Sequence, residues 1–163
     1  MWMELIQPFL SAADAVLSEA LAGPVSISDI SMEEEAYRRR AVAVMIEISG
    51  DIEGRVIFDV EEPVAALVAS SITGEAEPPS DPQLLREAAA ELANLVIGNA
   101  VTALNDQGFR FKVHPPEYHP ADEGFRGSED EEALVMDFAS EKGSVFLNIV
   151  MRYNRRRRAD GTH

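Results

Sequence analysis

One predicted helix carries side chains whose types and spacing could do chemistry. The helix should span residues 82–106, and it presents Glu87, Glu91, Asn94 and Gly98 on one face. Because a helix advances about 100° per residue, Glu91 and Asn94 project from the same side. A carboxylate can pair with a basic side chain, and an amide can both donate and accept hydrogen bonds. The same pair is also typical of an ordinary solvated helix surface, so the spacing alone leaves both interpretations open.

Two residue types on this stripe are unfavourable inside a helix. A glycine costs about 1 kcal/mol relative to alanine, and asparagine is also a poor helix former. Gly98 follows Asn94 by about one turn, and a position without a side chain would let another backbone approach closely. We therefore expect the stripe to face solvent or a partner molecule.

A second stripe of the same helix should be buried. Helical spacing places these apolar residues on one face: Leu84, Leu85, Ala88, Leu92, Leu95, Val96 and Ala103. Asn99 falls inside this stripe. We expect Asn99 to make a hydrogen-bonded contact in the core or between helices rather than to act in a site.

The rest of the chain predicts the elements that position this helix. Apolar periodicity predicts a first helix over residues 4–21, and a second should run from Pro63 to about Ile72. β-Branched residues and turn sequences predict strands at 25–30, 40–49, 55–60, 109–114, 133–139 and 144–153. Antiparallel blocks of strands predict an α+β fold, in which the long helix and a second helix pack on an antiparallel sheet, plus an N-terminal helix. We recognise no internal repeat, and we predict a single domain over residues 1–154 with a disordered basic tail at 155–163.

Composition and charge argue against several classes of function. The 163 residues include 29 acidic and 14 basic side chains but no cysteine, which leaves no disulfide and no thiolate site. A net charge of −15 should repel nucleic acid and anionic membranes, so neither is expected as a partner. The four arginines at 155–158 could bind either, but a solvated charge run is the simpler interpretation. Since neither a secretory signal nor a membrane-spanning apolar run is recognised, we expect a cytoplasmic protein.

A histidine-containing segment could suggest a metal site. His114, Glu117 and His119 lie in a proline-rich segment, where neither helical nor strand register fixes the geometry of ligands. We expect ordinary loop residues there, and no metal site.

Residues 91–100, with the sequence ELANLVIGNA, resemble the signature helix of the CheX family of chemotaxis phosphatases, which is related to CheC. Other segments resemble the family's first helix, its strand–turn–strand with a G-x-x-x-G turn, the end of its second helix and the strand that leaves the signature helix. In that order they are residues 4–9, 48–54, 71–74 and 112–116. The resemblance covers roughly residues 4–152 in the right order.

This resemblance implies a reaction and a set of roles. Members of the family hydrolyse the aspartyl phosphate of CheY-like response regulators, and the best-known examples are homodimers. Carried across residue by residue, Asn94 would orient the attacking water, and Glu91 would contact the active-site lysine of the regulator. Glu87 and Gly98 would lie against the partner, although related CheC proteins often carry Asp or Ser at the position of Glu87.

The resemblance also implies that the protein needs no cofactor of its own, since the Mg²⁺ would sit in the acidic pocket of the regulator. Two alternatives stay open. The chain could dock a receiver domain without hydrolysing its phosphate, or it could be a structural part of a signalling or motility complex.

Overall fold

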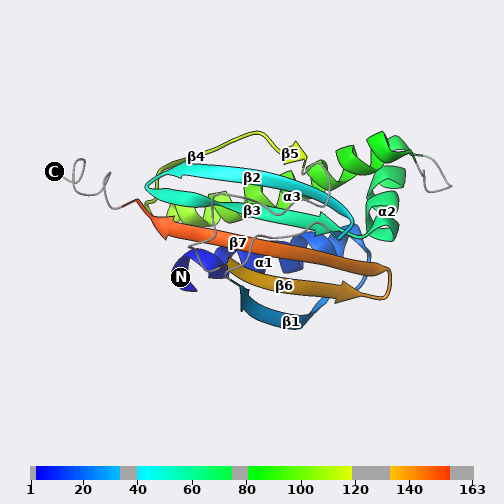
Figure 1. Ribbon diagram of the computed structural model, residues 1–163, viewed down its shortest axis with the longest axis horizontal. Coiled ribbons are helices and arrows are strands. Elements are labelled where there is room, and N and C mark those ends of the chain that lie inside the picture. The colour runs from blue at the N-terminus through cyan, green and yellow to red at the C-terminus, as the bar shows by residue number, and fades with distance from the viewer. Residues whose placement is uncertain (1–2, 34–39, 75–80, 119–132, 155–163) are drawn as a thin grey trace.

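The computed structural model describes residues 3–33, 40–74, 81–118 and 133–154. In these residues, three helices and a seven-stranded antiparallel sheet form an α+β fold, as predicted (Figure 1). The elements are α1 (Met3–Ala20), β1 (Ser26–Glu33), β2 (Val42–Gly50), β3 (Ile52–Val60), α2 (Glu62–Thr73), α3 (Pro82–Asp106), β4 (Phe111–Val113), β5 (Glu117–Tyr118), β6 (Ala133–Ser140) and β7 (Gly143–Tyr153). The predicted tail at 155–163 lies outside the described residues.

All three helices lie on one face of the sheet (Figure 1). The strands follow the order β1-β6-β7-β3-β2-β4, each neighbouring pair is antiparallel, and β5 also pairs with β2. Successive side chains of a strand point to opposite faces, so alternate residues such as Val44, Phe58 and Leu147 join the helices in one buried core. The sheet thus forms a platform that holds α3 with its outer face toward solvent.

The fold consists of two matching halves, and each half is one helix followed by strands of the sheet. The first half is α1-β1-β2-β3, the second is α3-β4/β5-β6-β7, and α2 connects them. Read from its two edges inward, the sheet gives β1-β6-β7 and β4-β2-β3, which correspond element by element. The two halves meet at the centre of the sheet, where β3 and β7 pair antiparallel and Ile57 lies opposite Asn148. The expectation that the chain has no internal repeat is therefore wrong.

Two glycines beside the turn between β2 and β3 allow neighbouring strands to approach closely. Gly54 has a φ of 153°, a conformation almost confined to glycine. A Cβ there would lie 2.8 Å from the carbonyl carbon of Val150 and 2.9 Å from the Cα of Met151. A Cβ on Gly50 would lie 2.7 Å from the Cα of Phe111. The absence of both side chains lets β3 pair with β7, and β2 with β4.

Helix α3 has the predicted bounds, and its capping explains its start. The side chain of Asp81 accepts a hydrogen bond of 3.0 Å from the backbone N–H of Gln83, and Pro82 occupies the first turn. In α2, Gly74 follows the last turn in the left-handed conformation, with a φ of 75°. These local signals lie in the sequence itself, which is why the ends of both helices could be predicted.

Candidate functional site

The four predicted site residues form one exposed stripe on α3. Glu87, Glu91, Asn94 and Gly98 are all exposed, and they lie on the side of the helix that points away from the sheet. The opposite side packs on β2 and β3, and α3 also contacts α1 and α2. A helix held by two other helices and a sheet is a rigid support for its outward-facing side chains. The predicted stripe is thus brought together on a surface that a partner can reach.

The polar groups of this stripe are available for intermolecular contacts. Across the described parts of the chain, no hydrogen bond or ion pair engages the side chains of Glu91 and Asn94. Gln83 Nε2 donates a hydrogen bond of 3.2 Å to Glu87 Oε1, which orients that carboxylate. Glu87 and Glu91 lie four residues apart, a like-charge arrangement that costs about 0.2–0.5 kcal/mol in a helix. A basic group from a partner would remove this cost, and that makes the stripe suited to a cation.

Gly98 is not explained by the packing of the chain itself. A Cβ built at this position meets no atom within 4 Å. The hydroxyl of Thr102 donates a hydrogen bond of 3.0 Å to the carbonyl oxygen of Gly98, so the helix continues normally past the glycine. The open space agrees with the expectation that this position faces outward.

The prediction of which face of α3 is buried is partly wrong. Leu85, Ala88, Leu92 and Val96 are buried as expected, but Leu84 is half-buried and Leu95 is 48% exposed. The buried face is centred on the other side of Leu92, and it includes three small residues: Ala89, Ala93 and Ala100. The prediction gave weight to the leucines and little to these alanines. The predicted stripe is therefore rotated about the helix axis away from the observed buried face.

Asn99 was predicted to make a hydrogen-bonded contact in the core or between helices. Its side chain is exposed, so the core position is wrong. It lines a groove between α1 and α3. Its neighbour Leu95 is a surface residue that the sequence interpretation missed. In the sequence, only the position of Leu95 directly after Asn94 indicated that it could be exposed. Its apolar side chain favoured the opposite prediction, a buried position.

The histidine-containing segment is only partly described. His114 Nε2 lies 2.9 Å from the hydroxyl of Ser49 on the neighbouring strand β2, and Glu117 belongs to the short strand β5. His119 lies outside the described residues. Among those that are described, no three His, Asp or Glu side chains gather as they would around a metal ion. No described helix is long and apolar enough to cross a membrane.

Comparison with known proteins identifies the class of the fold. A CheC-like superfamily protein from Shewanella sp. PV-4 has a TM-score of 0.78 and 22% identity, over 93% of this chain and 99% of that one. CheX from Vibrio vulnificus has a TM-score of 0.75 and 22% identity, over 91% and 99%. CheX of Borrelia burgdorferi, in a CheX–CheY–BeF3–Mg²⁺ complex, has a TM-score of 0.63 and 30% identity, over 90% and 97%. No curated protein matches the sequence.

The family follows from the sequence match together with this fold. Residues 42–139, more than half of the chain, match the family described as chemotaxis phosphatase CheX. The chain belongs to the CheX family.

Proposed function

We propose that this protein hydrolyses the aspartyl phosphate of a CheY-like response regulator. The observation that carries the proposal is the exposed Glu91–Asn94 pair, which engages no other described side chain, on the signature helix of a CheX-family fold. The relative from Borrelia burgdorferi, 30% identical, forms a complex with CheY, and this supports a receiver domain as the partner. Response regulators act in the cytoplasm, and we propose the same location for this chain.

In the proposed reaction, a water molecule attacks the phosphorus atom in line with the bond to the aspartyl oxygen. That bond breaks, and the products are inorganic phosphate and the aspartate carboxylate of the regulator. An acyl phosphate is already activated, so catalysis needs mainly a well-placed water. The amide of Asn94 can accept a hydrogen bond from the water and donate another without titrating near neutral pH. Asn94 would thus be the catalytic residue.

The other residues of the stripe would hold the partner in place. The carboxylate of Glu91 would pair with the regulator's lysine, in an interface that excludes water and strengthens the ion pair. Glu87, held by Gln83, would add to the negative potential that attracts this lysine. The metal in this scheme is a Mg²⁺ ion bound by the regulator, so the phosphatase itself would need no cofactor.

A binding module is the alternative proposal. The same exposed stripe could dock a receiver without accelerating the loss of phosphate. Tight binding of the activated receiver without faster dephosphorylation would favour this alternative. A purely structural role would require the stripe to be covered in the resting assembly.

Replacing Gly98 by alanine is expected to separate stability from function. Because the new Cβ meets nothing within 4 Å, the fold should gain about 0.5–1 kcal/mol from the higher helix propensity of alanine. The partner's backbone would be held off by the added methyl group, so affinity for the receiver should fall. Thermal unfolding and binding titrations measure the two effects. A stabilised variant that binds as tightly as the wild type would show that Gly98 does not contact the partner.

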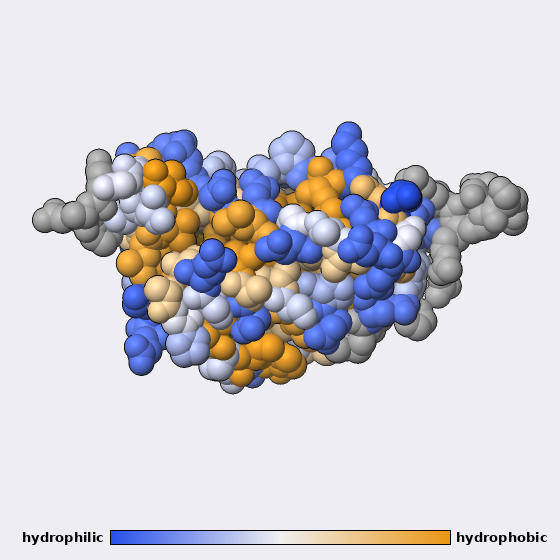
Figure 2. Space-filling view, turned by 180° about the vertical axis from the view of Figure 1, so that it is seen from behind, coloured by the Kyte–Doolittle hydropathy of each residue, from blue (hydrophilic) through white to orange (hydrophobic). Residues whose placement is uncertain are grey.

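We also propose a homodimer that is formed through β1, the outer strand at one edge of the sheet. Ile27, Ile30 and Met32 of β1 are 43%, 53% and 48% exposed. They pair with Phe138, Met136 and Leu134 of β6 and point to the helix-bearing face. Figure 2 shows this face, with hydrophobic atoms gathered at its lower edge, where β1 lies. Edge strands with exposed apolar residues are prone to pair with another chain.

Replacing Ile30 by lysine should weaken this dimer. A charge in the centre of the apolar row would be buried by dimerisation without a partner, which is unfavourable. Sedimentation at micromolar concentration should show a dimer for the wild type and a monomer for Ile30→Lys. A wild-type monomer under these conditions would contradict the proposal.

A further inference from the structure

Leu95 is a large apolar residue on the exposed side of α3. It is 48% exposed, so much of its surface remains available to a partner. The other exposed large apolar side chains of the described residues lie on β1, α2 and β5: Ile27, Ile30, Met32, Ile72 and Tyr118. Within the part of the chain that the structure describes, Leu95 is therefore the one that lies on the helix of the proposed site.

Leu95 adjoins the proposed site residues on the surface of the helix. It follows Glu91 by four residues, which is about 40° around the axis and about 6 Å along it, and it precedes Gly98 by three. Residues three or four apart are neighbours on a helix surface. A partner whose lysine pairs with Glu91, and whose backbone approaches Gly98, would therefore also cover Leu95.

Apolar side chains flank the carboxylate of Glu91 in both directions along α3. Leu84 is half-buried and lies about two turns before Glu91, and Leu95 lies about one turn after it. Both are displaced from Glu91 toward the same side of the helix, by about 20° and 40° around the axis. An ion pair in an interface is strengthened where its neighbours exclude water. This apolar border is thus suited to shield a lysine that pairs with Glu91.

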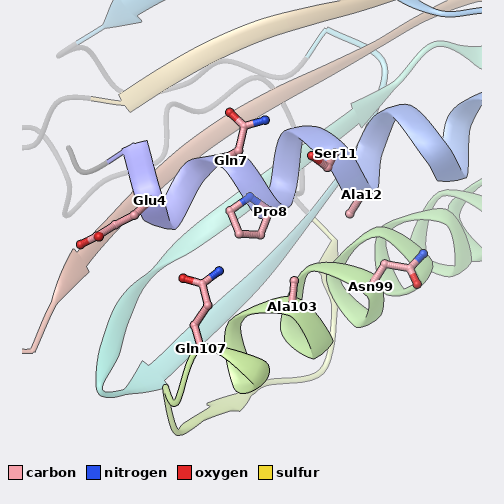
Figure 3. A pocket seen from close by; sticks show the side chains of 8 residues that line it. All are labelled: Glu4, Gln7, Pro8, Ser11, Ala12, Asn99, Ala103 and Gln107. Atoms are coloured by element: carbon pink, nitrogen blue, oxygen red, sulfur yellow. The ribbon is translucent and has the colours of Figure 1, made fainter.

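Figure 3 shows where the apolar border ends. About one turn beyond Leu95, an open groove of about 510 Å³ begins between α1 and α3, with Asn99 on its α3 side. Apart from one proline, the residues that line it are polar or small: Glu4, Gln7, Pro8, Ser11, Ala12, Asn99, Ala103 and Gln107. Leu95 is outside this lining and lies between the groove and the polar stripe. A large apolar side chain of a partner would therefore be matched by Leu95 rather than by the groove.

We propose that Leu95 is an apolar anchor for the receiver domain. It packs against an apolar side chain that the receiver carries beside the lysine contacted by Glu91, and this inference rests on the function proposed above. The receiver is the occupant that the surface favours, because Leu95 is continuous with Glu91 and Gly98 on one helix. Leu95 is a positioning residue and touches neither the water nor the phosphorus. Affinity for the receiver should thus depend on Leu95, whereas the rate of the bound complex should not.

The binding test compares Leu95→Gln with Leu95→Met in the full chain. Both new side chains are unbranched and have similar helix propensity, but only methionine is apolar. The probe is a receiver domain activated by beryllofluoride and Mg²⁺, and binding is followed by titration calorimetry. We expect Leu95→Gln to bind about fivefold more weakly, the size expected when about half of a leucine side chain is no longer buried against an apolar surface. Leu95→Met should bind like the wild type.

Two further readouts distinguish an anchor from a merely structural residue. The heat-capacity change of binding should become less negative in Leu95→Gln but not in Leu95→Met, because less apolar surface is buried. With a phosphorylated receiver as substrate, KM of Leu95→Gln should rise about fivefold while kcat is unchanged. Loss of Asn94 should have the opposite effect, a lower kcat.

The matched control is Ile72→Gln. Ile72 is an apolar residue of α2 that is 58% exposed, and its replacement should leave affinity and KM unchanged. Thermal unfolding shows whether each variant is folded, and all three should be, because the replaced side chains are exposed.

Three results would overturn the anchor. A folded Leu95→Gln could bind as tightly as the wild type, which would make Leu95 an ordinary surface residue. Leu95→Met could lose as much affinity as Leu95→Gln, or Ile72→Gln could weaken binding equally. In each case the wild type would still bind the activated receiver, and the proposed function would stand. If the wild type binds no activated receiver at all, the proposed function fails together with the anchor.

Discussion

Asn94→Ala is expected to lower the protein's acceleration of receiver dephosphorylation by about 100-fold, the size expected when a group that positions a reacting water is lost. Affinity for the activated receiver should change little, because Glu87, Glu91 and Gly98 remain. The fold should be unaffected, since Asn94 is exposed and its side chain engages no other described residue. Phosphate release from a phosphorylated receiver measures the rate, and titration with a beryllofluoride-activated receiver measures the affinity.

The matched control for this substitution is Asn105→Ala. Asn105 is an exposed asparagine on α3, about three turns beyond Asn94. Its loss should leave both rate and affinity unchanged. If Asn94→Ala were as active as Asn105→Ala, the water would be positioned by another group. If both binding and rate fell together, Asn94 would act in docking rather than in catalysis.

Gly54→Ala should destabilise the fold by about 3–5 kcal/mol. Two unfavourable contributions add up to this loss of stability. One is the strain of alanine at a φ of 153°, and the other is the steric overlap of its Cβ with the backbone of β7 at Val150. A loss of this size is a large fraction of the stability of a typical domain. Chemical denaturation followed by circular dichroism measures it, and the loss should affect the whole domain because β3 and β7 form the centre of the sheet.

The comparison with Gly98→Ala isolates the cause of this destabilisation. Both substitutions add the same methyl group, but the one at Gly98 enters open space and should stabilise the protein. A Gly54→Ala variant with wild-type stability would mean that β3 and β7 can separate at this point without loss of pairing.

Local signals explain which parts of the fold could be predicted. The ends of α3 follow from Asp81, Pro82 and the residues after Asp106, and these signals depend on their immediate neighbours. The hairpin of β6 and β7 follows in the same way from its turn at 141–143. The exposed positions of Glu91 and Asn94 were also predicted correctly, because helical geometry places both of them on the side of the helix away from Leu92 and Val96, which are buried.

Features that depend on distant contacts could not be read from local patterns. Leu95 was predicted to be buried but is exposed, because the elements packed against α3, namely α1, α2, β2 and β3, decide which face of the helix is buried. The two-fold repeat was missed for a related reason. The matching of the two halves lies in the order in which their strands pair, and the sheet topology was needed to recognise it.

One time course tests the central claim most directly. A purified receiver domain is phosphorylated, and the loss of its phosphate is followed with and without a substoichiometric amount of this protein. A phosphatase would shorten the half-life of the aspartyl phosphate in proportion to its concentration, with each molecule acting on many receivers. If the receiver binds and the half-life is unchanged or longer, the Glu91–Asn94 stripe docks the regulator without hydrolysing its phosphate.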